Sequence, residues 1–480
     1  MPRDVLVIGG GPAGASAARL LALWGHDVRL VTLPSVARDF HPATLAESLP
    51  PSCSKIFDAI GVREAIERAG FLRSTGNTVW WGADDARVET FEHGAQGWQV
   101  TRHALAAVLL ASAQAAGVRI EHAHVVSSGR ALAPPFTAAI ILDCTGRGGL
   151  FARARGWRVY EQTLRTVALV GAWHKAEQWR LPDPTHTLIE SYAGGWAWSV
   201  PVDDHRGYFA VMVDPRSSDL SDGASRSIYL SELAKTRRLS ALVNDADLEG
   251  GPWGWDASMY SSLEYADDSV LLVGDAGSFI DPLSSAGVKK ALASAWLAAI
   301  AAHTALVRPS MRRTAFDFFA AREREIYTSF RTLTERFLAD AAQGHQHPFW
   351  ADRAGPLDVE DSRRESGADS ADSDVQTAFD ALRKASALAV RRSEEVRIES
   401  RPAVSGCEVV LQERITTARD ATGARYIRDV DVVELVAMAP AFRDVGDLYD
   451  AYCRRSAPVA LPDFLTALAT ALARRWLVWV

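Results

Sequence analysis

The sequence has 480 residues, of which 48% are hydrophobic and 23% are charged, and its net charge at pH 7 is −7. This length predicts two or three domains, and the composition is ordinary for a globular protein with an ample core. The negative charge and a pI near 6.0 argue against bulk attraction to nucleic acid or to an anionic membrane surface. No apolar run reaches the ~18–20 residues needed to span a bilayer, so we expect neither nucleic acid nor membrane as a partner.

Cysteine usage and the first residues indicate the cellular compartment. The four cysteines, Cys53, Cys144, Cys407 and Cys453, are widely spaced and form no CxxC pair. This pattern favours reduced thiols over a disulfide framework or a zinc site, so we expect no bound metal. The sequence starts with MPRDVLVIGG and enters a strand at once, which leaves no room for a signal peptide and predicts a cytoplasmic protein.

The first motif reads GGGPAG at Gly9–Gly14 and follows a buried strand predicted over Val5–Ile8. In this arrangement Gly9 permits the tight turn, Gly11 lets the backbone approach a pyrophosphate, and Gly14 lets the following helix pack close to the strand. The phosphate then lies on the N-terminus of that helix. The motif therefore predicts a dinucleotide held by Gly9, Gly11, Pro12, Ala13 and Gly14.

The acidic residue that usually holds the ribose of such a dinucleotide is missing, because the expected position near Thr32 is not acidic. Arg38 is a candidate for contacts with phosphate or adenine. Arg102, at the start of a predicted helix, either pairs with cofactor phosphate or forms a surface salt bridge. In HPATLAESLPP, Glu47 and Ser48 either meet the cofactor or serve as a solvated acid and a helix cap.

A second motif, SVLLVGDAGSFIDPLSSAGVKKA, occupies Ser269–Ala291. Val270–Val273 is predicted as a buried strand, and Gly274 and Asp275 follow at its end, where α/β sheets place their ligands. The Asp275 carboxylate is suited to accept hydrogen bonds from sugar hydroxyls. The first amides of the helix that starts near Val288 suit an electron-rich ring edge, such as a flavin pyrimidine. The predicted cofactor contacts here are Gly274, Asp275, Ser285, Ala286, Gly287 and Val288.

Between these motifs, Gln162–Trp173 and Thr187–Asp214 are predicted as long β segments. Within GWAWSVP, the alternation of a strand places the indoles of Trp196 and Trp198 on one face, together with Val200. This part of the chain predicts a mostly antiparallel, substrate-side sheet inserted between the cofactor-binding pieces.

Three motifs together resemble the FAD-dependent monooxygenase superfamily: GGGPAG, DCTGR at Asp143–Arg147, and GDAGSFIDPLSSAG at Gly274–Gly287. The last of them, with ESLPP at Glu47–Pro51 and GWAWSVP at Gly195–Pro201, is similar to the flavin-dependent (tryptophan) halogenase-like branch. The resemblance covers roughly residues 1–350, about three quarters of the chain.

This resemblance implies FAD as the cofactor, with its pyrophosphate at Gly11 and Gly14, its ribitol near Asp275 and its isoalloxazine near Ser285–Val288. In the superfamily, reduced FAD and dioxygen form a C4a-hydroperoxide. Hydroxylases transfer its oxygen to an activated ring, whereas halogenases intercept it with halide.

The sequence departs from the halogenase pattern at one position. Halogenases need a lysine just before the strand that here ends in Trp81-Gly82, and the matching residue is Ser74 or its neighbour Arg73. The pKa of an arginine is too high for haloamine chemistry, and serine has no amine. The departure therefore favours hydroxylation over halogenation.

The resemblance and this departure predict an FAD-dependent monooxygenase that hydroxylates an indole or a phenol, either a small molecule or a peptide- or protein-bound tryptophan. Glu47 is the first candidate for the general base, with Asp281 and Glu190 behind it, although Glu190 is more readily explained as a structural acid. Electrons come either from NAD(P)H directly or from a partner flavin reductase. The alternatives are a flavin-dependent halogenase, a flavin-dependent reductase and a non-catalytic flavin-binding maturation partner.

The predicted fold class is α/β, with a Rossmann-like FAD-binding domain, an inserted antiparallel sheet domain and a small α+β C-terminal module. The predicted boundaries are 1–160 and 265–345 for the FAD-binding domain, 161–264 for the sheet domain, 346–376 for a flexible linker and 377–480 for the C-terminal module.

The C-terminal module is expected to resemble a winged helix. Its predicted elements are a helix at Thr377–Arg392, a hairpin of Glu408–Thr417 with Ala424–Val436, helices at Val445–Arg455 and Pro462–Arg475, and a strand at Trp476–Val480. No basic stripe argues for DNA binding. The module either docks a peptide or subunit or simply packs on the main domain.

Overall fold

The computed structural model describes residues 3–34, 45–128, 131–133, 136–181, 183–216, 220, 225–354 and 373–480. The chain divides into two compact units, Met1–Leu357 and Asp358–Val480. Of the predicted site residues, Arg38 lies outside the described residues.

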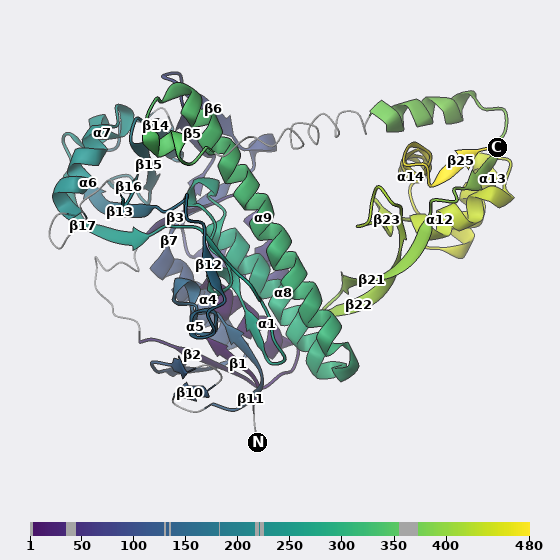
Figure 1. Cartoon of the computed structure of the whole chain (residues 1–480), viewed down its shortest axis with the longest axis horizontal. Helices are drawn as coiled ribbons and strands as arrows, with labels where there is room; N and C mark the ends of the chain where they lie inside the picture. Colours follow the sequence, from purple (N-terminus) through teal and green to yellow (C-terminus); the bar gives the residue numbers. More distant parts are fainter. Residues whose placement is uncertain are drawn as a thin grey trace. The chain divides into compact units, whose positions relative to one another are not determined.

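A five-stranded parallel sheet forms the base of the first unit (Figure 1), in the order β19-β11-β1-β2-β8. These strands are β1 (Arg3–Ile8), β2 (Val28–Thr32), β8 (Arg119–His122), β11 (Ala138–Asp143) and β19 (Val270–Leu272). The apolar runs of β1, β11 and β19 are largely buried, as is typical of the central strands of a parallel sheet, whereas the edge strand β8 is polar and partly exposed. The predicted Rossmann-like arrangement is therefore confirmed.

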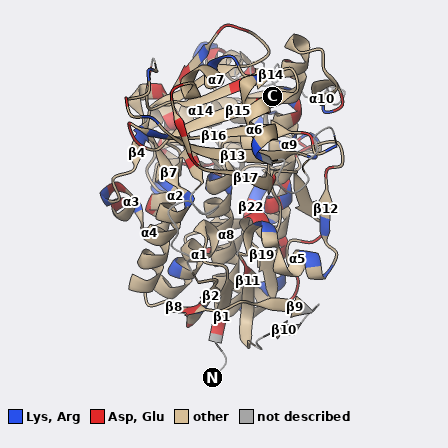
Figure 2. Ribbon diagram, turned by 90° about the vertical axis from the view of Figure 1, so that its left-hand side faces the viewer, with Lys and Arg blue, Asp and Glu red and all other residues tan. Residues whose placement is uncertain are grey.

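Three helices pack together against this sheet: α1 (Pro12–Leu23), α4 (Arg102–Ala115) and α8 (Gly287–Val307). Figure 2 shows α1 and α8 as mostly uncharged helices in the interior of the unit. Contrary to the sequence prediction, α8 is long and apolar enough to cross a membrane, but 67% of its most apolar window is buried inside the protein. Burial against α1 and α9 (Arg312–Gly344) explains this apolar surface as that of a core helix.

A seven-stranded sheet lies above the first, in the order β17-β13-β16-β15-β14-β5-β6. Its strands are β5 (Gly76–Trp80), β6 (Arg87–Thr90), β13 (Val167–His174), β14 (Thr187–Tyr192), β15 (Gly195–Pro201), β16 (Arg206–Val213) and β17 (Asp247–Asp256). All neighbouring strands are antiparallel except β14 and β5, which are parallel. The predicted mostly antiparallel sheet is present, and β5 and β6 join it from far earlier in the sequence.

Smaller elements connect the two sheets. A three-stranded sheet contains β3 (Ala46–Leu49), β7 (Gly97–Thr101) and β4 (Leu72–Ser74), and β12 (Arg158–Tyr160) pairs with β18 (Tyr260–Ser262). The remaining helices of this unit are α2 (Cys53–Ile60), α3 (Arg63–Arg68), α5 (Leu150–Ala154), α6 (Ser225–Ala234), α7 (Arg238–Val243) and α10 (Pro348–Ala351). The hairpin β9 (Val126–Ser128) with β10 (Ala131–Ala133) completes it.

The linker predicted over 346–376 begins too early in the sequence. Residues 348–351 form α10, in which the Trp350 side chain is fully buried, and its indole Nε1 donates a hydrogen bond to the Tyr192 carbonyl at 2.9 Å. This segment belongs to the core of the first unit because its aromatic side chains are part of a hydrophobic cluster that includes residues of the seven-stranded sheet.

The second unit has its own hydrophobic core and differs from the predicted module in two places. Residues 373–384 are helical, but Val390–Arg392 is a strand, β20, that pairs with β25 (Leu477–Trp479). Of the predicted hairpin, the structure forms only the bridge between Ile415 and Ala424, whereas the full length of β22 (Glu408–Thr416) pairs with β21 (Arg397–Ser405) through a turn at Gly406. That glycine has φ of +58°, which a turn of this kind favours and which the sequence prediction overlooked.

The segment assigned to the other strand of that hairpin instead forms β23 (Tyr426–Ile427), β24 (Val430–Asp431) and α12 (Val432–Met438). The Asp431 carboxylate caps α12 by accepting hydrogen bonds from its first amides. The two predicted helices that follow are present as α13 (Val445–Arg455) and α14 (Leu461–Ala473).

Candidate active site

One cavity of about 490 Å³ takes its walls from both predicted motifs and from the seven-stranded sheet. It lies beyond the carboxyl ends of β1 and β19, where ligands bind to open parallel sheets. One side is backbone and polar groups, and the other is aromatic. The cavity therefore brings the predicted cofactor surface and the tryptophans of GWAWSVP into one space.

The phosphate end of the cavity is shaped by glycines that have different tasks. A Cβ at Gly9 would lie 2.2 Å from the Cys144 carbonyl oxygen, and one at Gly14 would lie 1.8 Å from the Gly9 oxygen. These two glycines allow close packing of strand and helix. A Cβ at Gly11 would meet nothing within 4 Å, and Gly11 lines the cavity with an ordinary φ of −71°. Gly11 thus leaves open the space that a pyrophosphate would fill.

The Asp275 carboxylate is a polar group with an oxygen that lacks a hydrogen-bond partner in the described structure. It lines the cavity, and its Oδ1 is buried without a hydrogen-bond partner in the described structure. Lys290 of α8 lies behind it, with Nζ 4.0 Å from that oxygen. The Lys290 ammonium also donates to the carbonyl oxygens of Gly274 and Ser278, at 3.2 and 2.7 Å, which fixes the loop that carries Asp275. A sugar hydroxyl in the cavity would supply the hydrogen bond that this carboxylate lacks.

The N-terminus of α8 supplies backbone donors to the same cavity. No side chain caps this helix, and Gly287 and Val288 of its first turn line the cavity. Ser285 precedes the helix with φ of +48°, a left-handed conformation that costs a serine ~1–3 kcal/mol and is typical of functional sites. Uncapped amides with partial positive charge suit the electron-rich edge of a ring or an anion.

Two predicted site residues form an ion pair beside the phosphate end. The Arg102 guanidinium donates a short hydrogen bond to the Glu47 carboxylate, and both residues line the cavity. Burial by itself lowers the pKa of Arg102, but the carboxylates of Glu47 and Asp275 outweigh burial and raise it. Since Glu47 is held by a permanent cation, it is a poorer candidate for a general base than the sequence suggested.

The opposite wall of the cavity is aromatic. Trp196 and Trp198 of β15 line it together with Val200, as the strand alternation predicted. Trp255 from β17 and Phe279 from the second motif complete this wall. Aromatic faces of this kind bind flat, electron-rich rings by stacking and edge contacts. This arrangement predicts an aromatic substrate.

Asp281 is the titratable group best placed at this wall. Its side chain is 7% exposed and lines the cavity, and its Oδ1 accepts a hydrogen bond from the Leu283 amide at 2.9 Å. Burial raises the pKa of Asp281 to about 6, against the opposing effects of the Leu283 hydrogen bond and the positive charge of Arg353. A carboxylate with a pKa close to neutral is suited to accept a proton and release it again.

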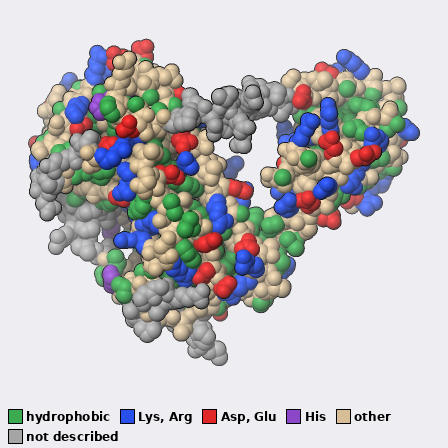
Figure 3. All heavy atoms as spheres, viewed as in Figure 1, with side chains coloured by type: hydrophobic (Ala, Val, Ile, Leu, Met, Phe, Trp, Pro, Cys, Tyr) green, Lys and Arg blue, Asp and Glu red, His purple; other side chains and the backbone are tan. Residues whose placement is uncertain are grey.

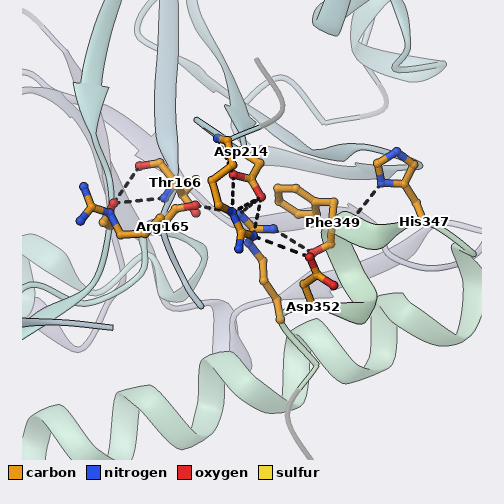
Figure 4. Close-up of polar contacts among 9 residues, drawn as sticks. Arg165, Thr166, Asp214, His347, Phe349 and Asp352 are labelled. Atoms are coloured by element: carbon orange, nitrogen blue, oxygen red, sulfur yellow. Dashed lines mark hydrogen bonds and ion pairs between the residues drawn. The ribbon is translucent and has the colours of Figure 1, made fainter. Parts of the chain in front are cut away.

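Arg353 is itself buried and fixed from several sides. Its guanidinium forms an ion pair with Asp214 at 3.0 Å and donates to the carbonyl oxygens of Phe349 and Arg165, at 3.0 and 2.7 Å. Figure 4 labels these partners, Asp214, Phe349 and Arg165, within one group of polar contacts. Burial raises the pKa of Asp214, but the hydrogen bonds from Arg216 and the charge of Arg353 hold it at about 2. This network holds a fixed positive charge near the Asp281 side of the cavity.

The structure divides the predicted site residues into two groups. Those that line the cavity are Gly11, Pro12, Glu47, Ser48, Arg102, Asp275, Asp281, Ser285, Gly287 and Val288. Those that shape it from behind are Gly9, Ala13, Gly14, Gly274 and Ala286. Glu190 is elsewhere and caps α7, because its carboxylate accepts hydrogen bonds from the amides of Arg237, Arg238 and Leu239. That is the structural role expected for it.

Sequence reasoning missed other residues of the wall, among them His103, Thr187, Trp255 and Phe279. His103 directly follows Arg102 at the start of α4, so the sequence that predicted Arg102 as a site residue could also have predicted His103. Thr187 and Trp255 come from strands of the inserted sheet, and only its strand order brings them to the cavity. No local pattern in the sequence gives that order.

A family model described as an FAD binding domain matches residues 3–301. The tryptophan 2-halogenase of Chondromyces crocatus is 29% identical over 343 residues, which cover 66% of this chain and 64% of that protein, just under two thirds of its length.

Two solved structures cover almost the whole chain. The flavin-dependent halogenase CmlS has a TM-score of 0.76 at 19% identity and covers 99% of this chain and 96% of its own. The peptidyl tryptophan dihydroxylase QhpG has a TM-score of 0.68 at 22% identity and covers 99% and 98%. At these identities the similarity shows a shared fold.

Exchange of Gly11 for leucine tests the phosphate end of the cavity. The new side chain would project into open space with no backbone strain, so we expect a folded protein that no longer takes up FAD. Flavin absorbance after gel filtration measures the uptake, and circular dichroism measures the fold.

The matched variant is Gly14→Val, whose Cβ would clash with the Gly9 carbonyl oxygen. We expect it to lose folded, soluble protein rather than flavin alone. A Gly11→Leu protein that binds FAD normally would contradict the placement of the phosphate.

Proposed function

The chain belongs to the FAD-binding-domain family, and we propose that it is an FAD-dependent monooxygenase that hydroxylates an electron-rich aromatic ring, an indole or a phenol. FAD is its cofactor, and the protein is a flavin-dependent oxidoreductase. One observation carries the proposal. A single cavity joins the predicted flavin surface to a wall of tryptophan side chains and is lined by the buried carboxylate of Asp281. Among the described residues, no lysine lines this cavity.

The two residues that match the position of the halogenase lysine, Ser74 and Arg73, support hydroxylation over halogenation. Ser74 is fully buried, and its hydroxyl donates to the Gly76 carbonyl oxygen at 3.3 Å. Arg73 points its guanidinium over the Trp98 ring, 4.9 Å from the centroid, and forms an ion pair with Glu67. Neither residue lines the cavity. Lys290 does not replace the missing amine, because its Nζ is engaged by two carbonyl groups behind Asp275.

The proposed reaction inserts one oxygen atom of dioxygen into a ring C–H bond and reduces the other to water with two electrons and two protons. Reduced FAD supplies the activation of dioxygen when it is bound. The protein contributes the rest: Trp196 and Trp198 hold the ring, and the apolar wall excludes water. The Asp281 carboxylate accepts the proton that the ring carbon loses as aromaticity returns.

The same chemistry extends to a tryptophan within a peptide or protein. The peptidyl tryptophan dihydroxylase that shares this fold over almost its full length supports such a substrate. The electrons come either from NAD(P)H directly or from a partner flavin reductase, and an assay with and without added reductase separates these two supplies.

Halogenation is the second candidate function, because the tryptophan 2-halogenase is the relative with 29% identity. It requires a carrier or catalyst for hypohalous acid other than the missing lysine. A reductase or a non-catalytic flavin-binding partner would also have this fold, and dioxygen dependence distinguishes both from a monooxygenase.

Product analysis tests the proposal. We expect the FAD-loaded protein, supplied with reductase, labelled dioxygen and chloride or bromide, to incorporate one labelled oxygen into a member of an indole, phenol and tryptophan-peptide panel. Mass spectrometry of the products measures this. A halogenated product as the main species would establish halogenation instead, and turnover under anaerobic conditions would establish a reductase.

Exchange of Asp281 for asparagine tests the proton acceptor. Asparagine keeps the oxygen that accepts the Leu283 hydrogen bond, so we expect unchanged folding and flavin uptake. In the unchanged protein, kcat/KM should fall below pH about 6, because protonation removes the base.

In Asp281→Asn, kcat/KM should drop about 10²- to 10⁴-fold. The fall of kcat/KM below pH about 6, the acid limb of the pH profile, should disappear. Glu47→Gln serves as the comparison, since Glu47 is paired with Arg102, and it should retain the acid limb. An acid limb that persists in Asp281→Asn and vanishes in Glu47→Gln would reverse the assignment.

A further inference from the structure

A second pocket, of about 460 Å³, opens on the surface behind the aromatic wall of the cavity. Its lining residues are Arg147, Arg153, Gly156, Arg158, Tyr160 and Asp256. We call it the arginine pocket, because three guanidinium groups face one carboxylate in a chain whose net charge is −7. Figure 2 shows basic segments on α5 and β12, which carry two of these arginines. Elsewhere, acidic and basic side chains are interspersed on the visible face of this unit (Figure 3).

Arg147 is fixed at one side of the arginine pocket. Its guanidinium forms an ion pair with Asp256 at 3.2 Å and donates to the Ser258 carbonyl oxygen at 3.3 and 3.4 Å. It also lies 4.0 Å over the centroid of the Phe279 ring. These contacts hold the charge in place without a ligand.

Arg158 is positioned just as closely but has no carboxylate partner. Its guanidinium lies 4.0 Å over the Tyr260 ring, and its Nη1 donates to the Arg147 carbonyl oxygen at 2.7 Å. Its Nε and Nη2 are buried and have no hydrogen-bond partner. Gly149 makes room for this side chain, because a Cβ at that residue would lie 1.9 Å from Nη2. Buried donors without partners lose the hydrogen bonds that water would give.

Arg153 is exposed at the pocket and forms no ion pair with any residue in the described ranges. The carboxylate of Asp143 acts on Arg158 only from a distance, because no described acid lies within 4.0 Å of either the Arg153 or the Arg158 guanidinium. Two of the three positive charges are therefore uncompensated at close range.

From this arrangement we propose that the arginine pocket binds a phosphate-bearing ligand. Guanidinium groups pair with phosphate oxygens through two parallel hydrogen bonds, which is stronger and more directional than contact with a single point charge. The Tyr160 ring at the rim offers a face for a flat group attached to the phosphate. Two sources share this chemistry: the diphosphate of a nicotinamide dinucleotide and the phosphate of a pantetheine arm.

The pocket is coupled to the flavin side of the protein through two aromatic residues. The Phe279 ring under Arg147 also lines the large cavity, and the Tyr260 hydroxyl donates to the Asp275 carbonyl oxygen at 2.5 Å. A ligand in the arginine pocket would therefore lie one ring, that of Phe279, away from the aromatic wall of the large cavity, and Tyr260 would link it to the loop that carries Asp275. The inference rests on the FAD site alone, and it holds whether or not the protein hydroxylates its substrate.

Calorimetric titration of the FAD-loaded full chain tests this inference, with inorganic pyrophosphate, NADPH, NADH and coenzyme A as probes at one fixed low salt concentration. We expect at least one probe to bind with a stoichiometry of one. The charge reversal Arg153→Glu should weaken that binding at least about tenfold and leave FAD uptake unchanged, because Arg153 does not line the large cavity.

The matched control is Arg68→Glu, another exposed arginine on a short helix of the same unit, which should leave binding unchanged. Tightest binding by the nicotinamide dinucleotides would identify a hydride donor as the ligand class. Tightest binding by coenzyme A would identify a pantetheine arm, and equal binding of pyrophosphate would identify a free diphosphate. The inference is overturned if no probe binds below about 10 mM, or if the two charge reversals weaken binding equally.

Discussion

The close approach of backbone to backbone at the end of β1 is the constraint on which the rest of the site depends. Gly9 touches the Cys144 carbonyl group, and Gly14 touches Gly9, so the first helix begins directly against the parallel sheet. Only this packing leaves Gly11 at the edge of open space instead of under a side chain. The anionic part of the cofactor can then meet backbone amides and a helix N-terminus, and no cationic side chain is needed for it.

The second half of the site adds what the first cannot supply, which is a surface for a flat substrate. The seven-stranded sheet turns two tryptophans of β15 and one of β17 toward the cavity. Asp281 lies at the boundary of the two halves, where burial raises its pKa to about 6 and Arg353 opposes that rise. The surfaces proposed to hold a flavin and an aromatic ring, and the proposed proton acceptor, therefore come from three distant parts of the sequence.

Much of this arrangement could be predicted from the sequence, because its motifs are local. GGGPAG and GDAGSFIDPLSSAG each combine a buried strand, a turn and a helix within two dozen residues, and strand alternation alone placed Trp196 and Trp198 on one face. The FAD-binding family and the α/β fold followed from these motifs. Ten of the residues predicted to contact the cofactor or act in catalysis line the cavity, and their roles stay predictions. The predicted domain boundaries also stay predictions, except that residues 348–351 belong to the first unit and not to the linker.

The features of the site that could not be predicted from the sequence depend on contacts between distant segments. The pairing of Glu47 with Arg102 and the effect of Arg353 on Asp281 arise only in the folded chain, so the order of the candidate bases changed. The pairing of β22 with β21 was not predicted, because a turn is available on both sides of β22. In the structure β22 pairs along its length with β21 and by a single bridge, from Ile415 to Ala424, with the segment on its other side. The arginine pocket could not be predicted from the sequence, because its three arginines lie on three different elements and form no local motif.

The account stands on one claim, that a flavin and an aromatic ring occupy the same cavity. The most direct measurement is the visible difference spectrum of the FAD-loaded protein during titration with indoles and phenols. We expect a saturable perturbation of the flavin bands, weakened when Trp198 is replaced by alanine, because this indole lines the cavity opposite the flavin surface. A substrate that is turned over without changing the flavin spectrum, or a perturbation indifferent to that replacement, would contradict the claim.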